Sequence, residues 1–500
     1  VTSLNYNNTW GKHTLDAGAF LEYFKAHYRY FGFTEEGLDP KTFFPGDGSG
    51  FIADNTSNDL FSDTVFADIL NAGLFSYFGQ ADYDYDARYG VTGTIRRDAS
   101  YRFADSNKWA TFYSISGRWN IGNESFMEGS VFDALKVRAS YGTAGNQRIA
   151  GGSYFTAPDL TRSLFATGAG YAGINSLSLS QIGNNTLRWE TVRQTDIGLD
   201  FEIFNRRLRG SFDYYWKTTE DLFQNRSISA VTSTTALRAN IGNLYNEGFD
   251  FTLNYDVIRG GVKGFNLGVN LVGNYNKTEL GDIPTSDGIA TYGRSGGILN
   301  EYRVVRYAGV NPANGQLLYY TADGELTESP DLDNDRVFLD KNIYPDLSGS
   351  FGFSADYKGF FLQTQWNYVV GVDRFDFDLA GLQDPSSIGQ FRSSTDLLRA
   401  WTPDNRNTDI PSLFVTNDVG GSDRYLRSAD YLRLRFASFG YSFPKEFISD
   451  AGISSLRIFA NAENFITISK WRGYDPETQS NGSRNYPTPK TISFGVELGL

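Results

Sequence analysis

The 500-residue chain carries a formal net charge of −13, contains no cysteine and has two histidines, His13 and His27. This charge argues against a nucleic-acid partner, and the lack of cysteine excludes disulfides and thiolate metal sites. The mean hydropathy is −0.38 and no run of about 18 apolar residues exists, which excludes a transmembrane helix. A membrane β-barrel is still allowed, because its strands alternate apolar and polar residues, so that its mean hydropathy resembles that of a soluble protein.

Alternation of apolar and polar residues recurs along the whole chain, in a composition rich in aromatic residues (16%) and glycine (53 residues) that is typical of β structure. The clearest segments are 135–141, 197–203, 212–216, 249–257, 265–271, 351–357 and 492–500, and weaker ones are 70–85, 88–98, 110–121 and 360–368. Successive side chains of a strand point to opposite faces, so each segment predicts a strand with one apolar face. Within 431–443 the alternation changes phase near Ala437, which predicts a β-bulge or a strand boundary there.

The connections between these segments alternate between short and long. Short turns are predicted at 11–12, 86–87, 205–206, 260–264 and 358–359, with a somewhat longer turn at 444–454, and the long polar segments are 29–68, 144–185, 223–243, 280–345, 375–424 and 469–488. Outer-membrane barrels have short periplasmic turns and long extracellular loops. A β-sandwich would instead turn every 8–12 residues or so, without a bias to one side.

Following the pattern of strands, short turns and long loops along the whole chain gives about fifteen membrane strands, which start on a downward strand and end on the periplasmic side. Plugged transporters have roughly 22 strands, and an open sheet edge is not tolerated in lipid. We therefore expect an all-β fold in which residues 1–500 form the C-terminal portion of a transmembrane antiparallel β-barrel. About seven further strands are expected to belong to a longer precursor.

Motif-like stretches follow one another from about residue 70 to the end of the chain. Arg-Arg-Asp-Ala-Ser-Tyr-Arg-Phe at 96–103 is followed by Trp-Ala-Thr-Phe-Tyr-Ser at 109–114 and by Leu-Lys-Val-Arg-Ala-Ser-Tyr-Gly at 135–142. The other stretches are 189–191, 196–200, 243–248, 307–315, 461–465, 473–477 and 486–487. Each motif alone is weak, but the ordered set resembles the SusC/RagA-type TonB-dependent transporters of the Bacteroidetes outer membrane.

The resemblance implies nutrient import across the outer membrane of a Gram-negative, Bacteroidetes-like bacterium, with an oligosaccharide or oligopeptide as substrate. It implies a SusD-like surface lipoprotein that caps the extracellular loops and energy coupling through TonB. It also implies contact with lipid and lipopolysaccharide and allows a dimer of transporter–lipoprotein pairs. The family's N-terminal accessory domain, TonB-contacting segment and plug have no counterpart in this sequence.

Two functional alternatives remain open beside import. The barrel could be a structural or assembly subunit of a larger outer-membrane complex that keeps the fold without transport. The second alternative is a barrel enzyme. Enzymatic activity is not expected, because the G-x-S-x-G match at 293–297 has no histidine downstream.

Three acidic residues, Asp331, Asp333 and Asp335, stand where the family has a D-x-N-x-D-G loop. Their oxygen atoms could hold Ca²⁺ in an extracellular loop, but an EF-hand loop needs Gly and Glu where this chain has Arg336 and Asn342. A solvated acidic loop is therefore the favoured interpretation, and no other cofactor is expected.

Aromatic residues in or beside the long polar segments are candidates for contact with a ligand or a partner. They are Tyr302, Tyr307, Tyr319, Tyr320, Trp401 and Tyr425. The alternative for this set is an aromatic girdle at the level of the lipid headgroups.

Arg433 and Arg435 alternate with Leu432 and Leu434, so we expect both to point into the lumen. There they would contact the plug or line the path. An arginine that faced lipid at the bilayer midplane would cost about 2–4 kcal/mol.

Overall fold

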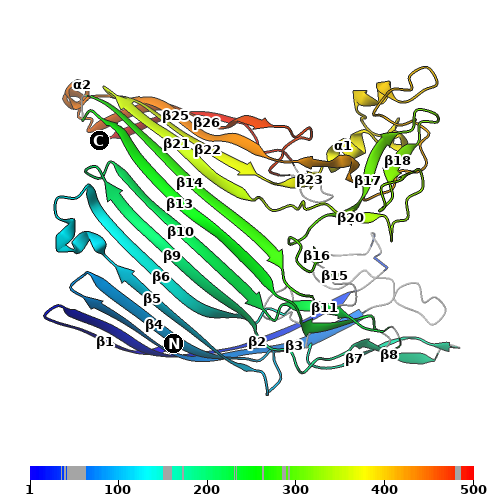
Figure 1. Cartoon of the computed structure of the whole chain (residues 1–500), viewed down its shortest axis with the longest axis horizontal. Coiled ribbons are helices and arrows are strands. Elements are labelled where there is room, and N and C mark those ends of the chain that lie inside the picture. Colours follow the sequence, from blue (N-terminus) through cyan, green and yellow to red (C-terminus); the bar gives the residue numbers. More distant parts are fainter. Residues whose placement is uncertain are drawn as a thin grey trace.

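The computed structural model describes residues 1–34, 37–38, 41, 64–149, 160–171, 174–229, 231, 234–261, 264–283, 289–290, 293–478 and 486–500. Its main feature is one antiparallel sheet of 15 strands, in which each strand pairs with the strands before and after it in the sheet (Figure 1). The fold class and the predicted number of about fifteen strands are thereby confirmed. Among the described residues, no helix has the length and apolar character that spanning a bilayer would require.

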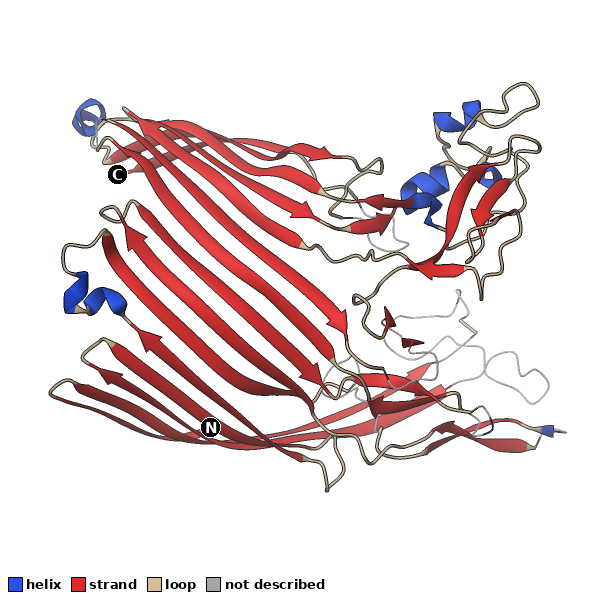
Figure 2. Ribbon diagram, in the orientation of Figure 1, coloured by secondary structure: helices blue, strands red, loops and turns tan. Residues whose placement is uncertain are grey.

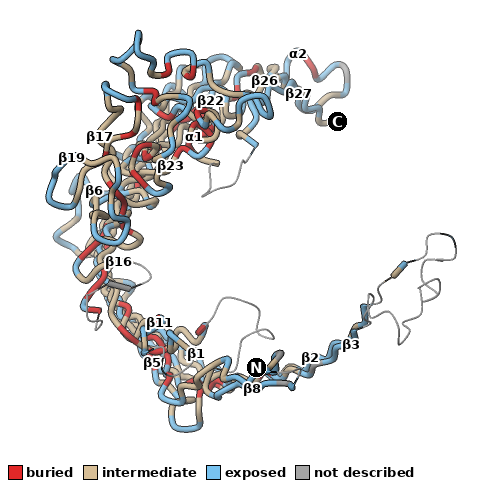
Figure 3. The backbone as a smooth tube through the Cα atoms, turned by 90° about the vertical axis from the view of Figure 1, so that its right-hand side faces the viewer, coloured by how far each residue is buried: buried red, intermediate tan, exposed pale blue. Residues whose placement is uncertain are grey.

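The strands of this sheet, which we call the wall, are long and neighbour one another in chain order. They are β1 (Thr2–Trp10), β2 (His13–Thr34), β3 (Thr64–Tyr85), β4 (Tyr89–Ser100), β5 (Trp109–Trp119), β6 (Phe132–Asn146), β9 (Glu190–Ile203), β10 (Leu208–Glu220), β13 (Leu244–Arg259), β14 (Phe265–Leu280), β21 (Leu347–Tyr357), β22 (Phe360–Val370), β25 (Tyr431–Ser442), β26 (Ser455–Ser469) and β27 (Thr491–Gly499). Seen end-on, the wall curves into an open arc (Figure 3). Within the sheet, β1 pairs with β2 alone and β27 with β26 alone.

The two faces of the wall differ as the alternation predicts. On one face, the apolar face, large side chains are exposed, such as Ile197 (49%) and Phe494 (83%). Aromatic rings stack across neighbouring strands there, as Phe212, Phe249 and Tyr275 do with centroid distances of 5.6 and 5.3 Å. The other face, the polar face, carries the charged and hydroxyl side chains.

Tight turns join the strands at one end of the wall, which Figure 2 shows opposite the long loops. The turn between β21 and β22 is typical, since Lys358 and Gly359 both adopt positive φ (48° and 92°), as a two-residue hairpin turn requires. The predicted short turns at 11–12, 86–87, 205–206 and 358–359 are present, whereas part of the predicted turn 260–264 lies outside the described residues. The connection between β5 and β6 was not predicted, and it contains two 3₁₀ turns, Ile121–Asn123 and Ser125–Met127.

The long connections gather at the other end, the loop end, and they contain secondary structure that the sequence did not predict. The strands there are β7 (Leu164–Ala169), β8 (Asn175–Gln181), β11 (Phe223–Ser227), β12 (Ala236–Asn240), β15 (Ile289–Ala290), β16 (Gly293–Arg294), β17 (Arg303–Val310), β18 (Leu317–Tyr320), β19 (Leu326–Thr327), β20 (Arg336–Phe338), β23 (Asp373–Phe375) and β24 (Leu426–Ser428). Helix α1 (Phe377–Leu382) lies at this end, and α2 (Lys445–Ile448) lies at the turn end. The strands β17 to β20 form a separate four-stranded sheet.

One predicted boundary is wrong, and one predicted irregularity is confirmed. The predicted loop 29–68 is partly strand, because β2 and β3 pair without interruption from His13–Tyr85 to Thr34–Thr64. The bulge predicted near Ala437 is confirmed and is located at Arg435, where the register of β25 with both neighbouring strands shifts between Leu434 and Phe436. A bulge of this kind places one extra residue on a strand and reverses the alternation after it.

Buried apolar residues are scarce in the middle of the wall and gather at the loop end in small clusters. One consists of Phe103, Phe112, Ile149, Leu187, Trp189 and Phe223, another of Val305, Leu317 and Tyr319, a third of Val372, Ala429 and Trp471, and a fourth of Leu397, Ala400 and Ile410. The loops are therefore packed units.

Candidate functional site

The polar face is crossed by ion pairs that link strands two apart. Arg118 on β5 binds Asp82 (2.9 Å) and Asp84 (2.8 Å) on β3, and so reaches over the intervening strand β4. It passes above Gly90 of β4, where any Cβ atom would collide with the guanidinium group. The glycine therefore makes this long-range pairing sterically accessible.

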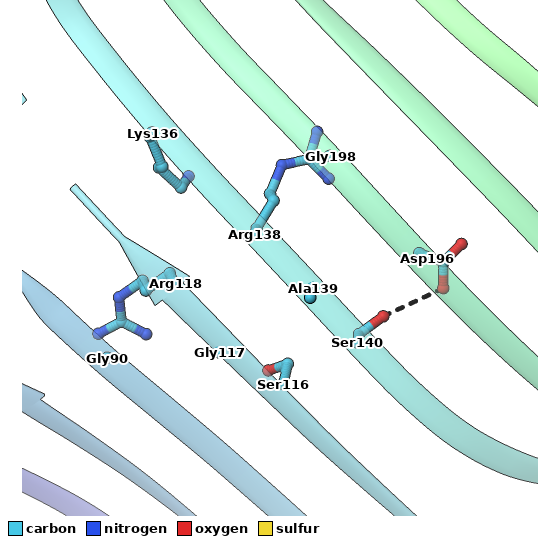
Figure 4. Close-up of a pocket in the computed structure, with 10 residues that line it drawn as sticks. All are labelled: Gly90, Ser116, Gly117, Arg118, Lys136, Arg138, Ala139, Ser140, Asp196 and Gly198. Atoms are coloured by element: carbon cyan, nitrogen blue, oxygen red, sulfur yellow. Dashed lines mark hydrogen bonds between the residues drawn. The ribbon is translucent and has the colours of Figure 1, made fainter. Parts of the chain in front are cut away.

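The same arrangement recurs on the neighbouring strands β6, β9 and β10. Arg138 on β6 binds Asp200 on β9 (3.1 Å) and reaches Asp213 on β10 (2.7 Å). It crosses β9 above Gly198, where a Cβ atom would again meet the guanidinium group. Figure 4 shows Arg118, Arg138 and Gly198 around a hollow of about 210 Å³ on this face.

These pairs give the polar face its chemical character. Each guanidinium is neutralised by carboxylates, yet the side chains of Arg118 and Asp82 are 30% and 39% exposed. Such a surface offers donors and acceptors to water and to polar solutes without a large local net charge. Among the described residues, no group of three or more histidine, cysteine, aspartate or glutamate side chains is arranged to hold a metal ion.

Three of the motifs that carry the family resemblance, 96–103, 109–114 and 189–191, meet at the loop end of the wall, where they act in packing. The Trp189 ring contacts Phe103 and Phe112 with centroid distances of 5.4 and 5.7 Å. Its Nε1 donates a hydrogen bond to the carbonyl of Lys108 (3.1 Å), and the carboxylate of the next residue, Glu190, accepts one from an amide at 2.6 Å. These residues hold the loop end of the wall together.

Arg433 is the most deeply buried charged residue that the sequence singled out, with 2% of its side chain exposed. It lies opposite Asn367 in the register of β22 and β25, which places it on the polar face. It binds Asp475 at 2.5 Å and Glu477 at 3.1 Å, both in the loop after β26. Those two carboxylates lie in the predicted motif 473–477, but their pairing with Arg433 was not predicted, because about 40 residues separate them.

Further contacts complete this cluster. Arg435, at the bulge, binds Glu477 at 2.5 Å, and Arg374 donates to the carbonyls of Pro476 (3.0 Å) and Glu477 (3.1 Å). Burial acts to raise the pKa of Asp475, but hydrogen bonds from Arg433 and from two backbone amides outweigh it, and the pKa lies below its usual value. We call Arg433, Arg435, Asp475 and Glu477 the C-terminal latch, because they fix the last long loop to the wall.

The six candidate aromatic residues all lie at the loop end, within its packed units. Tyr319 is fully buried, its hydroxyl donates to the carbonyl of Asn417 (3.1 Å), and burial raises its pKa to about 12. Tyr307 packs against Tyr319 at 6.3 Å, and Tyr302 packs against Phe375 at 5.2 Å.

The remaining three aromatics are partly exposed. Trp401 donates through Nε1 to the carbonyl of Pro312 (3.1 Å), and the guanidinium of Arg306 lies 5.0 Å from the Tyr320 ring centre. Tyr425 lines a pocket at the loop end that is described below. A ligand- or partner-contacting role of the set stays a prediction.

The acidic residues Asp331, Asp333 and Asp335 form a tight turn. The Asp335 carboxylate accepts hydrogen bonds from the amides of Asp331 (2.8 Å) and Ala322 (3.0 Å), and Asp331 accepts one from the amide of Asp333 (2.9 Å). A hydrogen bond from the side-chain amide of Asn334 (2.7 Å), together with the one from the amide of Asp333, lowers the pKa of Asp331. Carboxylates that satisfy backbone amides are ordinary turn formers, and Ca²⁺ binding here stays a prediction.

A pocket of about 680 Å³ lies between α1 and the segment 418–425, and we call it the loop pocket. Its walls are aromatic, glycine-rich and acidic: Phe375, Phe377, Ala380, Gly381, Asp384, Asp418, Val419, Gly420, Gly421, Ser422 and Tyr425. Apart from Tyr425, none of these residues was predicted as a site, because the contributing segments are separate in sequence and carry no motif.

Comparison with known proteins places this geometry in a family. The family described as "TonB dependent receptor-like, beta-barrel" matches residues 1–465. The chain is 30% identical over 463 residues to the TonB-dependent receptor P3 of Formosa agariphila, covering 85% of this chain and 45% of that protein. It is 29% identical over 451 residues to the TonB-dependent receptor SusC of Bacteroides thetaiotaomicron, covering 85% and 43%.

Solved structures agree with this placement. The wall and its loops superpose on the RagAB peptide importer in its "open-open" state with a TM-score of 0.82 and 26% identity, covering 100% of this chain and 54% of that chain. Another RagAB peptide transporter structure gives 0.81 and 25%. The chain spans about half the length of the curated relatives it matches. It belongs to the TonB-dependent receptor-like β-barrel family, and the SusC/RagA-type resemblance found in its motifs is confirmed.

Proposed function

We propose that this chain forms part of the wall of an outer-membrane importer for oligosaccharides or oligopeptides. The observation that carries the proposal is the contrast between the two faces of the wall. Exposed residues such as Ile197 and Phe494 suit contact with lipid and lipopolysaccharide. The paired charges around Arg118 and Arg138 suit a hydrated lumen.

The wall's chemistry supports passage of a polar solute. A polar substrate must exchange its hydrogen bonds with water for equivalent ones along the path, because an unpaired polar group is costly. Arginine–aspartate pairs supply hydrogen-bond donors and acceptors together. Because the two charges neutralise each other, the wall does not retain solutes of one charge sign. A TonB-dependent receptor from Bacteroides thetaiotaomicron and a peptide importer are among the similar proteins.

The partners are part of the proposal. A SusD-like lipoprotein would cover the loop end, where the packed loop units offer a firm platform, and TonB would supply energy through residues outside this chain. Transport would proceed by binding, closure and rearrangement of a plug, without covalent chemistry. A dimer of such transporter–lipoprotein pairs is part of the same proposal.

Gene deletion tests the function directly. We expect a strain that lacks the full-length gene to lose uptake of at least one oligosaccharide or oligopeptide, and the wild-type gene to restore it. The control is a strain that carries the full-length protein with its TonB-contacting segment removed, which should assemble but not transport. Unchanged uptake of every tested nutrient would contradict import.

Co-purification separates import from an assembly role. Purification of the full-length protein from native outer membranes should recover one SusD-like lipoprotein in about equal amount. Recovery of many secretion or insertion proteins in place of the lipoprotein would instead support a structural subunit of a larger complex.

A further inference from the structure

The loop pocket combines three aromatic rings with two carboxylates. Phe375 and Phe377 lie 5.6 Å apart between ring centres, and Tyr425 also lines the pocket, with its pKa raised to about 12 by burial. Phe377 is 43% exposed, so its ring is available to a ligand. A volume of about 680 Å³ lies within the range of about 300–1,000 Å³ that is usual for ligand sites.

The pocket carries an excess of negative charge. Asp418 is bound by the guanidinium of Arg424 at 3.0 Å, and that arginine is the only cation within salt-bridge distance of the pocket carboxylates among the described ion pairs. Asp384 has no such partner there. Its carboxylate accepts hydrogen bonds from the amide (2.9 Å) and hydroxyl (2.8 Å) of Ser386, which leaves acceptor capacity for a ligand.

The two carboxylates also influence each other. Burial raises the pKa of Asp418, Arg424 lowers it, and the charge of Asp384 raises it again, with a net upward shift. The Asp418 side chain is 47% exposed and lines the pocket, so it is accessible to a ligand there. A cation placed between Asp384 and Asp418 would relieve their repulsion.

We infer that the loop pocket binds the basic side chain of a short peptide, an inference that rests on the proposed import of oligopeptides. Aromatic rings stabilise a cation over their faces and pack against the methylene groups of arginine or lysine. The carboxylate of Asp384 can pair with a guanidinium through two hydrogen bonds. An anionic ligand would meet Asp384 and Asp418 and is disfavoured by both.

Binding measurements with the full-length receptor in detergent test this inference. The probe is the blocked pentapeptide Gly-Gly-Arg-Gly-Gly, compared with the same peptide carrying citrulline, which has nearly the same shape but no charge. We expect the arginine peptide to bind about tenfold more tightly, the size of one charge-assisted hydrogen bond. Equal affinities, or competition by a neutral oligosaccharide such as maltohexaose, would overturn the inference.

Two variants locate the effect. Asp384→Asn keeps an acceptor for the Ser386 amide, since Asn caps as well as Asp, and should abolish the preference for arginine over citrulline. Phe377→Ala should weaken the arginine peptide about threefold or more. The matched controls Asp404→Asn and Phe414→Ala change exposed residues of the same loop outside the pocket and should leave both affinities unchanged.

Uptake separates this inference from the proposed function. If the arginine preference depends on Asp384 but neither peptides nor oligosaccharides are taken up, import fails while the pocket assignment holds. If peptides are taken up and Asp384→Asn leaves the arginine preference intact, the pocket assignment fails while import holds.

Discussion

The wall and the loop end use the same residue types in different surroundings. In the wall, Arg118 and Asp82 form an ion pair with side chains that are 30% and 39% exposed. At the loop end, Arg433 and Asp475 form one with side chains that are 2% and 5% exposed. Solvent screens the first pair, whereas the second has lost its hydration and depends on its partner. The ion pairs of the wall therefore remain exposed to solvent, whereas the buried ion pair at the loop end holds a loop in place.

The largest expected effect is the loss of the buried pair. Arg433→Met keeps much of the side chain but leaves Asp475 buried without its cation, which should favour local opening by about 3–5 kcal/mol. Hydrogen exchange of residues 470–478 in the full-length protein would measure this opening.

A double variant serves as the control for that experiment. Arg433→Met combined with Asp475→Asn removes both charges and should recover a large part of the lost protection, because no unpaired charge remains. If Arg433→Met changed the opening free energy by less than about 1 kcal/mol, the buried pair would be no stronger than a surface pair.

The next effect concerns the two faces of the wall. Ile197 on β9 and Ser140 on β6 belong to adjacent strands, but Ile197 lies on the apolar face and Ser140 binds Asp196 on the polar face. Ile197→Arg should cost about 2–4 kcal/mol in a lipid bilayer if it lies near the midplane. Ser140→Arg should be nearly neutral, because Asp196 can pair with it. Unfolding by urea in lipid vesicles would compare them, and equal costs would contradict a lipid-facing apolar side.

This division also explains what the sequence could predict. A period of two residues is a local signal, so the strands, their apolar faces and the position of Arg433 followed from its neighbours Leu432 and Leu434. The pairing of Arg433 with Asp475 and Glu477 could not be predicted in this way, because pairing across about 40 residues depends on how a loop folds back. The bulge was predicted two residues late, because Arg435 itself continues the alternation.

The loop units were harder for a related reason. The short strands β17 and β18 pack their buried residues, such as Val305 and Tyr319, into a cluster too small to produce a long periodic pattern. The sequence of this segment therefore predicts a polar loop with scattered tyrosines. The loop pocket escaped prediction because α1 and the segment 418–425 meet only in three dimensions.

A moderate effect is expected from acid at the loop end. Asp396 receives a hydrogen bond from Gln383 and binds Arg399 and Arg472, and these contacts lower its pKa to about 2 against the opposing effect of burial. Because its pKa is lower in the folded protein, its contribution to stability is full above about pH 4 and is lost as the pH falls through about 2. The Asp396–Arg472 contact should therefore loosen in that range.

Spin labels would report this loosening. This chain has no cysteine, so labels can be attached at cysteines introduced at Phe391 and Tyr474, which are both 65% exposed. The distance distribution between the labels should broaden below about pH 3. Asp396→Asn should show the broad distribution already at neutral pH and should not respond further to acid. A narrow distribution at pH 2 would show that Arg472 does not hold these loops together.

The smallest effect is expected in the wall itself. Arg118→Gln removes the cation that bridges Asp82 and Asp84 but leaves every strand hydrogen bond in place, and the exposed carboxylates can regain water. The expected loss is about 0.2–1 kcal/mol in the free energy of unfolding. A double-mutant cycle with Asp82→Asn would measure the coupling. A coupling as large as that of Arg433 with Asp475 would mean that the polar face is drier than its exposure indicates, and that it is sealed in the assembled receptor.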